Sequence, residues 1–188
     1  MKKKKIVSVI IIGLMCLSLA ACSTEKKEKR QVNAVVRSVG ETSSFPKRVS
    51  IFKTEDFNGN TVTNEFFSQA DITVVNFWAT FCNPCIDELP ELEKWSEELP
   101  ENVQILGVLV DADSKDAEEY TTALQIIEKT NVKYTNILSA GAFEQFANNI
   151  VGVPTTFLID KEGNVIGKPI VGAKLDSYKK RVEKYLNK

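Results

Sequence analysis

The chain has 188 residues, of which 43% are hydrophobic and 26% are charged, so it has enough apolar material for one globular domain and is not disordered by composition. Its 24 basic and 25 acidic residues give a net charge of −1, and the part expected to fold is more acidic because lysines gather at the N-terminus. This argues against a nucleic-acid partner, because such partners favour a basic face.

The first 21 residues have the pattern of an export signal. Four lysines follow Met1, and Ile6 to Ala21 then form an apolar run that ends in small residues. This run is short for a permanent membrane span, which needs about 20 apolar residues. We therefore predict a signal peptide over residues 1–21. Its removal takes away four lysines and no acid, leaving 20 basic and 25 acidic residues.

The end of this segment, Leu19-Ala20-Ala21-Cys22, resembles a bacterial lipobox. The resemblance implies that Cys22 becomes the N-terminus, carries lipid and tethers the protein to a membrane of the cell envelope, outside the cytoplasm. Residues 22–31 would then be the anchor cysteine and a charged spacer, and residues 32–188 the folded domain. The alternatives are a plain signal peptide with an incidental cysteine and an uncleaved anchor.

The first elements of the domain are predicted to be strands. Val49 to Phe52 is typical of a short strand, Asp56 to Asn60 of a turn centred on Asn-Gly, and Val62 lies on the far side of that turn. Together they predict an N-terminal β-hairpin. Ile72 to Ala79 is a β-branched and aromatic run of strand length.

A helix is predicted directly after this strand. The apolar positions follow helical spacing and form one stripe: Cys85, Leu89, Leu92, Ser96 and Leu99. Pro90 should interrupt and kink this helix, and Pro100 should close it.

The rest of the chain alternates between strands and helices. The predicted strands are Val103–Val110, Tyr134–Leu138, Thr155–Asp160 and Val165–Val171. The predicted helices are Ser114–Thr130, with a stop at Asn131, a short one over residues 143–150 and a last one over residues 175–186. This order predicts an α/β fold with a mixed central sheet flanked by helices and with a late hairpin.

The stretch Phe81-Cys82-Asn83-Pro84-Cys85 raises the question of what its two cysteines do. A structural zinc site needs four ligands, usually Cys and His, and the chain has no histidine. Haem attachment would need a histidine where Ile86 stands. We therefore expect no metal and no cofactor. A static disulfide would close a tiny loop and add little stability, but it would be well placed to open and close.

This stretch contains the groups that a redox role requires, namely an easily ionised thiol, a second thiol and a group that can accept a proton. Cys82 lies where a strand ends and a helix begins, so that free N–H groups and the helix dipole favour its thiolate. Cys85 lies one turn further on the same face, and Glu88 three residues beyond it could manage a proton. Pro84 suits the first helical turn.

These residues carry a family resemblance. Val75 to Cys85 resembles the thioredoxin active-site segment, and Gly152 to Asp160 resembles the segment that carries a cis-proline facing the disulfide. Cys85 to Pro90 and the extra helical stretch at Ser114–Thr130 look like the TlpA/ResA branch of membrane-tethered thiol-disulfide oxidoreductases. The implied fold is thioredoxin-like with a central helical insertion.

The resemblance also implies roles for single residues. Cys82 and Cys85 would be catalytic, and a surface for substrates would include Val153, Pro154 and two aromatic residues of the active-site segment, Phe81 and Trp78. Val153-Pro154 would be a cis peptide bond. A buried strand aspartate of thioredoxins is replaced here by Asn76. Because an amide accepts no proton at neutral pH, the proton role would pass to Glu88, with a raised pKa.

The expected function is disulfide exchange with exported proteins that carry disulfides or thiols. The ResA branch mostly reduces, and an electron donor in the membrane, similar to CcdA or DsbD, would restore the thiols. The direction depends on redox potentials relative to the partners, so a disulfide oxidase or isomerase remains an alternative. Another is a non-catalytic binding or metallochaperone module. A thiol peroxidase would need Thr-x-x-Cys, a spacing that Thr80-Phe81-Cys82 does not have.

Overall fold

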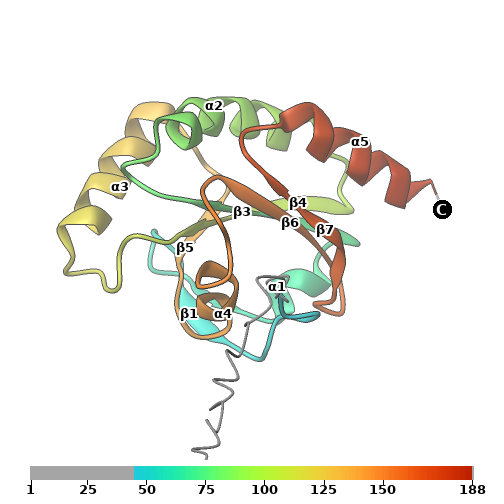
Figure 1. The fold of residues 1–188 in the computed structure, drawn as a ribbon, viewed down its shortest axis with the longest axis horizontal. Helices are drawn as coiled ribbons and strands as arrows, with labels where there is room; N and C mark the ends of the chain where they lie inside the picture. The colour runs from blue at the N-terminus through green and yellow to red at the C-terminus, as the bar shows by residue number, and fades with distance from the viewer. Residues whose placement is uncertain (1–44, 188) are drawn as a thin grey trace, which may run out of the picture. The chain divides into compact units, whose positions relative to one another are not determined.

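A five-stranded mixed sheet organises residues 45–187, the part of the chain that the computed structural model describes. The strand order is β5-β4-β3-β6-β7, and β3, β4 and β5 run parallel while β6 and β7 are antiparallel to their neighbours (Figure 1). The strands are β3 (Ile72–Trp78), β4 (Val103–Leu109), β5 (Thr135–Leu138), β6 (Thr155–Asp160) and β7 (Val165–Val171). The predicted mixed sheet is confirmed.

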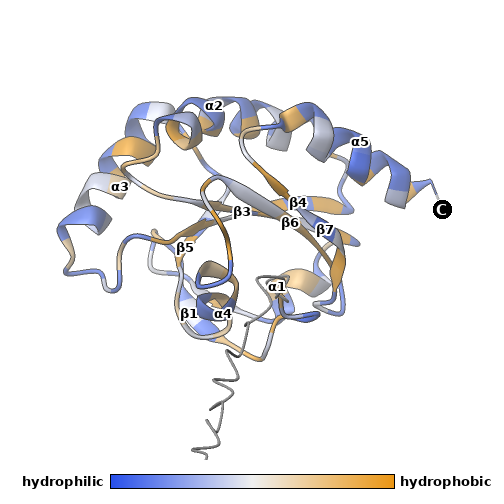
Figure 2. Cartoon of the chain, in the orientation of Figure 1, coloured by the Kyte–Doolittle hydropathy of each residue, from blue (hydrophilic) through white to orange (hydrophobic). Residues whose placement is uncertain are grey.

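Helices cover both faces of this sheet. On one face lie the three long helices, α2 (Asn83–Glu98), α3 (Glu118–Thr130) and α5 (Leu175–Leu186) (Figure 1). On the other lie α1 (Glu65–Ser68), α4 (Glu144–Ala147) with the 3₁₀ turn η1 (Gly141–Phe143), and the hairpin of β1 (Lys53–Glu55) and β2 (Thr61–Thr63). In Figure 2, α5 alternates between hydrophobic and hydrophilic segments, as expected of a helix with one buried face.

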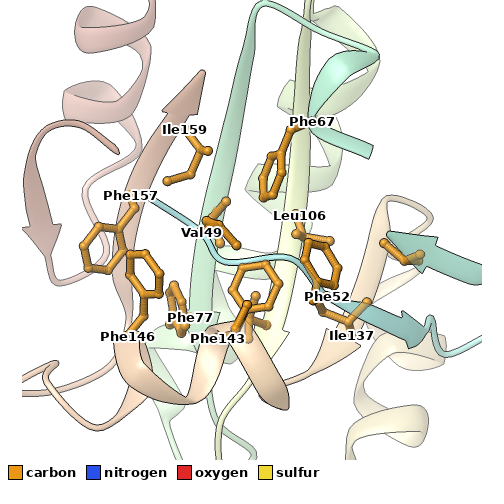
Figure 3. Close-up of a cluster of buried hydrophobic side chains, with 14 residues drawn as sticks. Val49, Phe52, Phe67, Phe77, Leu106, Ile137, Phe143, Phe146, Phe157 and Ile159 are labelled. Carbon is orange, nitrogen blue, oxygen red and sulfur yellow. The ribbon is translucent and has the colours of Figure 1, made fainter. Parts of the chain in front are cut away.

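The central strand β3 is buried along its whole length because both of its faces are covered. Its alternate side chains Val75 and Phe77 join an aromatic cluster under α1 and α4 (Figure 3), while Ile72 and Val74 pack on the side of α2 and α5. In the aromatic cluster Phe77 makes an edge contact with Phe157 at 5.5 Å between ring centroids. This packing fixes the end of β3, from which the cysteine pair follows.

One predicted element at the start of the domain differs from the structure. The predicted strand Val49–Phe52 is wrong, because the strand of the hairpin is β1, a few residues later. Val49 and Phe52 are both buried although they are three residues apart, which does not fit the alternation of a strand. The N–H of Phe52 donates to the side chain of Asn64 at 2.7 Å instead of to a neighbouring strand. The hairpin itself, with its turn at Asp56–Asn60, is confirmed.

The predicted helices are present with changed limits. The helical insertion begins at Glu118 rather than Ser114 and ends, as predicted, at Asn131, which has a left-handed conformation (φ 55°). The helix after the cysteines continues through Pro90 without the expected interruption. The segment 143–150 contains the end of the 3₁₀ turn η1 and the single turn α4.

Some predictions fall on residues that the structure does not describe. The signal peptide (1–21), the lipid-bearing Cys22, the spacer to residue 31 and the first residues of the domain all lie before residue 45. Within residues 45–187, none of the helices has both the length and the apolar character needed to cross a bilayer.

Candidate active site

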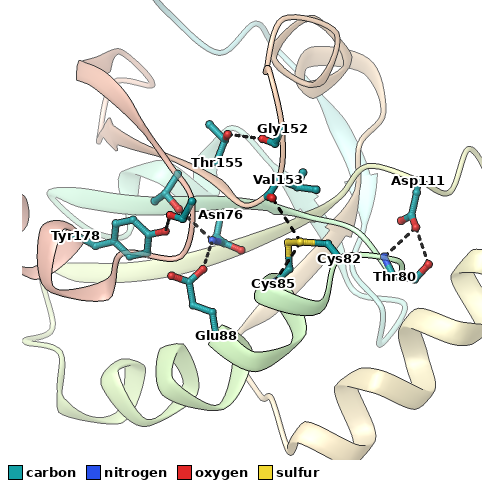
Figure 4. Close-up of a disulfide and its surroundings, with 12 residues drawn as sticks. Asn76, Thr80, Cys82, Cys85, Glu88, Asp111, Gly152, Val153, Thr155 and Tyr178 are labelled. Atoms are coloured by element: carbon teal, nitrogen blue, oxygen red, sulfur yellow. Dashed lines mark hydrogen bonds between the residues drawn. A yellow bond between two sulfur atoms is a disulfide. The ribbon is translucent and has the colours of Figure 1, made fainter.

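Cys82 and Cys85 are joined in a disulfide at the point where β3 gives way to α2 (Figure 4). Cys82 is the residue that caps the N-terminus of α2, and the N–H of Cys85 donates to its sulfur at 3.2 Å. Helix N-termini stabilise negative charge, so a thiolate on Cys82 is favoured when the bond is open. The predicted boundary between strand and helix is confirmed.

The peptide bond between Val153 and Pro154 is cis and lies against this disulfide. The carbonyl oxygen of Val153 is 3.5 Å from the sulfur of Cys82 (Figure 4). The side chain of Thr155 donates to the carbonyl of Gly152 at 2.6 Å and so helps to hold the loop. The predicted cis bond beside the disulfide is confirmed.

An apolar groove adjoins Cys82. It has a volume of about 460 Å³ and is lined by Phe81, Cys82, Val110, Ala147, Asn148, Ile150, Val151, Gly152 and Val153. Phe81 and Val151 are 74% and 82% exposed, which is unusual for large apolar side chains. The surface next to the reactive sulfur can therefore accept an apolar side chain of another molecule.

Trp78 does not belong to that surface, which corrects the expectation that it contributes to substrate binding. Its side chain is fully buried, and its ring N–H donates to the side-chain oxygen of Asn136 at 3.0 Å. Trp78 ends β3 and points into the layer between the sheet and α2 and α3, where Leu89 and Tyr120 also pack. Trp78 lies in the same buried cluster as the two cysteines and exposes no surface that a substrate could contact.

Glu88 is almost completely buried, with 3% of its surface exposed. One carboxylate oxygen accepts from the side-chain N–H of Asn76 at 3.3 Å and the other from the backbone N–H of Lys174 at 3.1 Å. Burial raises the pKa of Glu88, while the hydrogen bonds from Tyr178, Lys174 and Asn76 oppose that rise because they stabilise the anion. The predicted direction, with desolvation as the dominant cause, is confirmed.

Sequence reasoning missed most of the hydrogen-bond network around Glu88. Asn76 also donates to the hydroxyl of Thr156 at 3.0 Å, and the hydroxyl of Tyr178 lies in the same buried group (Figure 4). Tyr178 is recognisable in the sequence only as an apolar-face position of the last helix. Nothing local connects it to a glutamate on α2, because the two meet only when α5 packs on the sheet.

A second missed feature is the carboxylate that holds the segment before Cys82. One oxygen of Asp111 accepts from the N–H of Thr80 at 2.8 Å and from its hydroxyl at 2.6 Å. A signal for it exists in the sequence. Asp111 comes shortly after the buried strand β4. The carboxyl ends of adjacent parallel strands meet at the same edge of a sheet, and functional sites of α/β proteins form at that edge.

The chain is similar to one known protein family and to several individual proteins. Residues 46–168 match the AhpC/TSA family. The thiol-disulfide oxidoreductase ResA of Bacillus thuringiensis subsp. konkukian is 26% identical over 195 residues, which cover 100% of this chain and 98% of that protein. The thiol:disulfide interchange protein DsbE of Haemophilus influenzae is 28% identical over 166 residues, which cover 87% of this chain and 83% of that protein.

Among solved structures, the thioredoxin domain of a thiol-disulfide oxidoreductase from Bacteroides vulgatus is similar with a TM-score of 0.58 and 24% identity. The match covers 76% of this chain and 97% of that one. At this identity the similarity establishes the fold, and the expected thioredoxin-like architecture is confirmed.

Proposed function

The chain belongs to the AhpC/TSA family, and we propose that it is a thiol-disulfide oxidoreductase acting on proteins outside the cytoplasm. The observation that carries this proposal is the pairing of a disulfide at a helix N-terminus with a cis-proline loop, whose Val153 carbonyl is 3.5 Å from Cys82. The relatives named thiol-disulfide oxidoreductase and thiol:disulfide interchange protein support the same chemistry.

The reaction exchanges two electrons between the cysteine pair and a partner disulfide. The thiolate of reduced Cys82 attacks one sulfur of the partner, a mixed disulfide forms, and the other partner sulfur leaves as a thiolate. The thiolate of Cys85 then attacks the sulfur of Cys82. The second partner thiol leaves, and the disulfide between Cys82 and Cys85 seen in the structure is restored. The partner is thereby reduced and the protein oxidised.

The groove beside Cys82 supports an extended polypeptide as the partner. The cis-proline loop presents backbone next to the sulfur, and such backbone can pair with an extended segment of another chain. Phe81 and Val151 line the groove and provide exposed apolar side chains there. We propose the reducing direction, with thiols restored by a membrane donor similar to CcdA or DsbD.

We also propose that the protein is exported and anchored through Cys22. The leader pattern of residues 1–21 supports export, and the lipobox resemblance supports a lipid on Cys22. Cys22→Ala should leave the protein uncleaved or released from membranes in cells labelled with a lipid precursor. Label that persists in this variant contradicts the anchor, but leaves the redox proposal untouched.

The redox proposal is tested with the cysteine variants. Cys82→Ser should abolish the reduction of insulin disulfides by dithiothreitol-reduced protein, and Cys85→Ser should accumulate mixed disulfides on Cys82. The reducing direction predicts that proteins trapped by Cys85→Ser in the native host are recovered in the oxidised form when the gene is deleted. Reduction that survives in Cys82→Ser overturns the proposal, and partners found reduced in the deletion strain indicate an oxidase instead.

A further inference from the structure

The hydroxyl group of Tyr178 holds both ends of the loop between β7 and α5. It donates to the carbonyl oxygen of Gly172 at 2.9 Å and accepts from the backbone N–H of Lys174 at 3.3 Å. The same N–H of Lys174 also donates to the carboxylate of Glu88 at 3.1 Å. Tyr178 is fully buried, so solvent does not compete for these bonds.

This loop contacts the other side of the site as well. The N–H of Gly172 donates to the carbonyl oxygen of Pro154 at 2.7 Å. Pro154 is the residue after Val153, whose carbonyl oxygen is 3.5 Å from the sulfur of Cys82. One hydroxyl group is therefore linked, through the short backbone segment Gly172–Lys174, to the cis-proline loop and to the buried carboxyl group.

The groups that face Glu88 come from several elements. Glu91 is on the same helix, Asn76 on β3, Tyr134 directly before β5 and Tyr178 on α5. Glu91 raises the pKa of Glu88, and the hydrogen bonds of Tyr178 and Asn76 lower it. The hydroxyl of Tyr134 is buried and has no hydrogen-bond partner within residues 45–187. Tyr178 is therefore the tyrosine whose hydroxyl can respond to the charge on Glu88.

We propose that Tyr178 is a positioning residue of the exchange reaction, whose hydroxyl group holds the Glu88 carboxylate ready to accept the proton of Cys85. The hydroxyl is free to rotate between Gly172 and Glu88. It can donate to the carboxylate while Glu88 is charged and to the Gly172 carbonyl once Glu88 has taken the proton. This inference rests on the proposed function.

The step that Tyr178 supports is the second half of the exchange. The proton of the Cys85 thiol passes to Glu88, and the resulting thiolate attacks the sulfur of Cys82 in the mixed disulfide. The bond between Cys82 and the partner breaks, and the partner leaves as a thiolate. The attack of Cys82 on the partner precedes this step and does not involve Glu88.

Ellman's reagent separates the two halves. Reduced protein releases one coloured thiolate when Cys82 attacks the reagent and a second when Cys85 resolves the mixed disulfide. The coloured thiolate leaves without taking up a proton. The rate of the second phase therefore reports on how the thiol of Cys85 loses its proton. All samples carry Cys16→Ser and Cys22→Ser, so that only Cys82 and Cys85 react.

Tyr178→Phe keeps the buried ring and removes the hydroxyl. We expect the second phase to slow about three- to tenfold at neutral pH and its pH midpoint to move to higher pH, because the charged form of Glu88 loses a hydrogen bond. The first phase should change less than about twofold. In a Glu88→Gln background, Tyr178→Phe should no longer shift the pH profile of the second phase.

Tyr134→Phe is the matched control, since it removes a buried tyrosine hydroxyl that makes no hydrogen bond among the described residues. It should leave both phases and the pH midpoint unchanged. An unshifted second phase in Tyr178→Phe, or an equal shift with Glu88→Gln already present, overturns the inference while the proposed function stands. If no second thiolate is released by the parent protein, the proposed function itself fails.

Discussion

The side-chain amide of Asn76 donates a hydrogen bond to the carboxylate of Glu88 at 3.3 Å and thereby ties β3 to α2 beside the disulfide (Figure 4). Both side chains are buried. An amide neither gives up nor accepts a proton at neutral pH, whereas a carboxyl group does. Of these two partners, only Glu88 can therefore serve as a base for Cys85.

Replacing Glu88 by Gln should slow the resolution of the mixed disulfide by about tenfold or more, because a positioned general base contributes about 10²–10⁴-fold to a proton transfer. The pH dependence of that step should flatten, since Gln does not titrate. The second phase of thiolate release from Ellman's reagent, followed across pH, measures both effects.

The control is Glu98→Gln, which changes an exposed glutamate at the C-terminal end of α2, away from Glu88. It should leave the profile close to that of the parent protein. A parental pH profile in Glu88→Gln would mean that the proton of Cys85 goes directly to water.

The stability of the protein should also depend on Glu88 in a defined direction. Because burial raises its pKa above the ordinary value of 4.5, the native state keeps a proton that the unfolded state has lost. This carboxyl group therefore stabilises the fold below pH 4.5, and its contribution is lost as pH rises from 4.5 through the folded-state pKa.

Urea unfolding of the oxidised protein and of Glu88→Gln, measured from about pH 4 to about pH 8, tests this sign. The variant should gain stability relative to the parent protein as pH rises. A difference that stays constant across this range would show that Glu88 has the same pKa in both states.

Local sequence signals predicted the parts of the fold that are determined locally. The turn at Asp56 is held by its own carboxylate, which accepts from the N–H groups of Asn58 and Asn60, so residues close in sequence suffice to specify it. The same holds for the start of α2, where Cys82 caps the helix within one turn. The β-branched and aromatic run of β3 is typical of a strand that is covered on both faces.

Contacts between distant segments could not be predicted in this way. The strand expected at Val49–Phe52 failed because the side chain of Asn64, and not a strand, receives the N–H of Phe52. The network of Glu88 with Lys174 and Tyr178 depends on how α5 lies on the sheet. The role of Trp78 was misjudged because proximity to Cys82 along the chain does not tell which way a side chain points.

The two cysteines should differ in reactivity when the disulfide is reduced. Cys82 is 6% exposed and Cys85 1% exposed, and the N–H of Cys85 points at the sulfur of Cys82. Cys82 should therefore form the thiolate more readily and react at least about tenfold faster with iodoacetamide at neutral pH. Mass spectrometry of the reduced protein after short exposure measures both sites. Equal rates would contradict the assignment of Cys82 as the nucleophile.

The exposed aromatic ring of Phe81 should matter for protein substrates and not for small disulfides. Phe81→Ser removes an apolar contact of roughly 1–2 kcal/mol, so KM for insulin should rise several-fold while the rate with Ellman's reagent stays the same. Ile51→Ser is the control, because Ile51 is 94% exposed and lines a different hollow. Equal losses in both variants would show that surface apolarity in general, rather than this groove, binds the substrate.

Gly107 on β4 should tolerate no larger residue, because a Cβ there would lie 1.9 Å from the side-chain oxygen of Asn136. That oxygen accepts the ring N–H of Trp78. Gly107→Ala should displace Asn136, leave a buried donor unsatisfied and lower the free energy of unfolding by about 1–3 kcal/mol, with a changed tryptophan fluorescence. At Gly152 no described atom lies within 4 Å of an added Cβ, so Gly152→Ala should change stability by less than about 0.5 kcal/mol. Equal stability of the two variants in urea unfolding would contradict the close approach of β4 to Asn136.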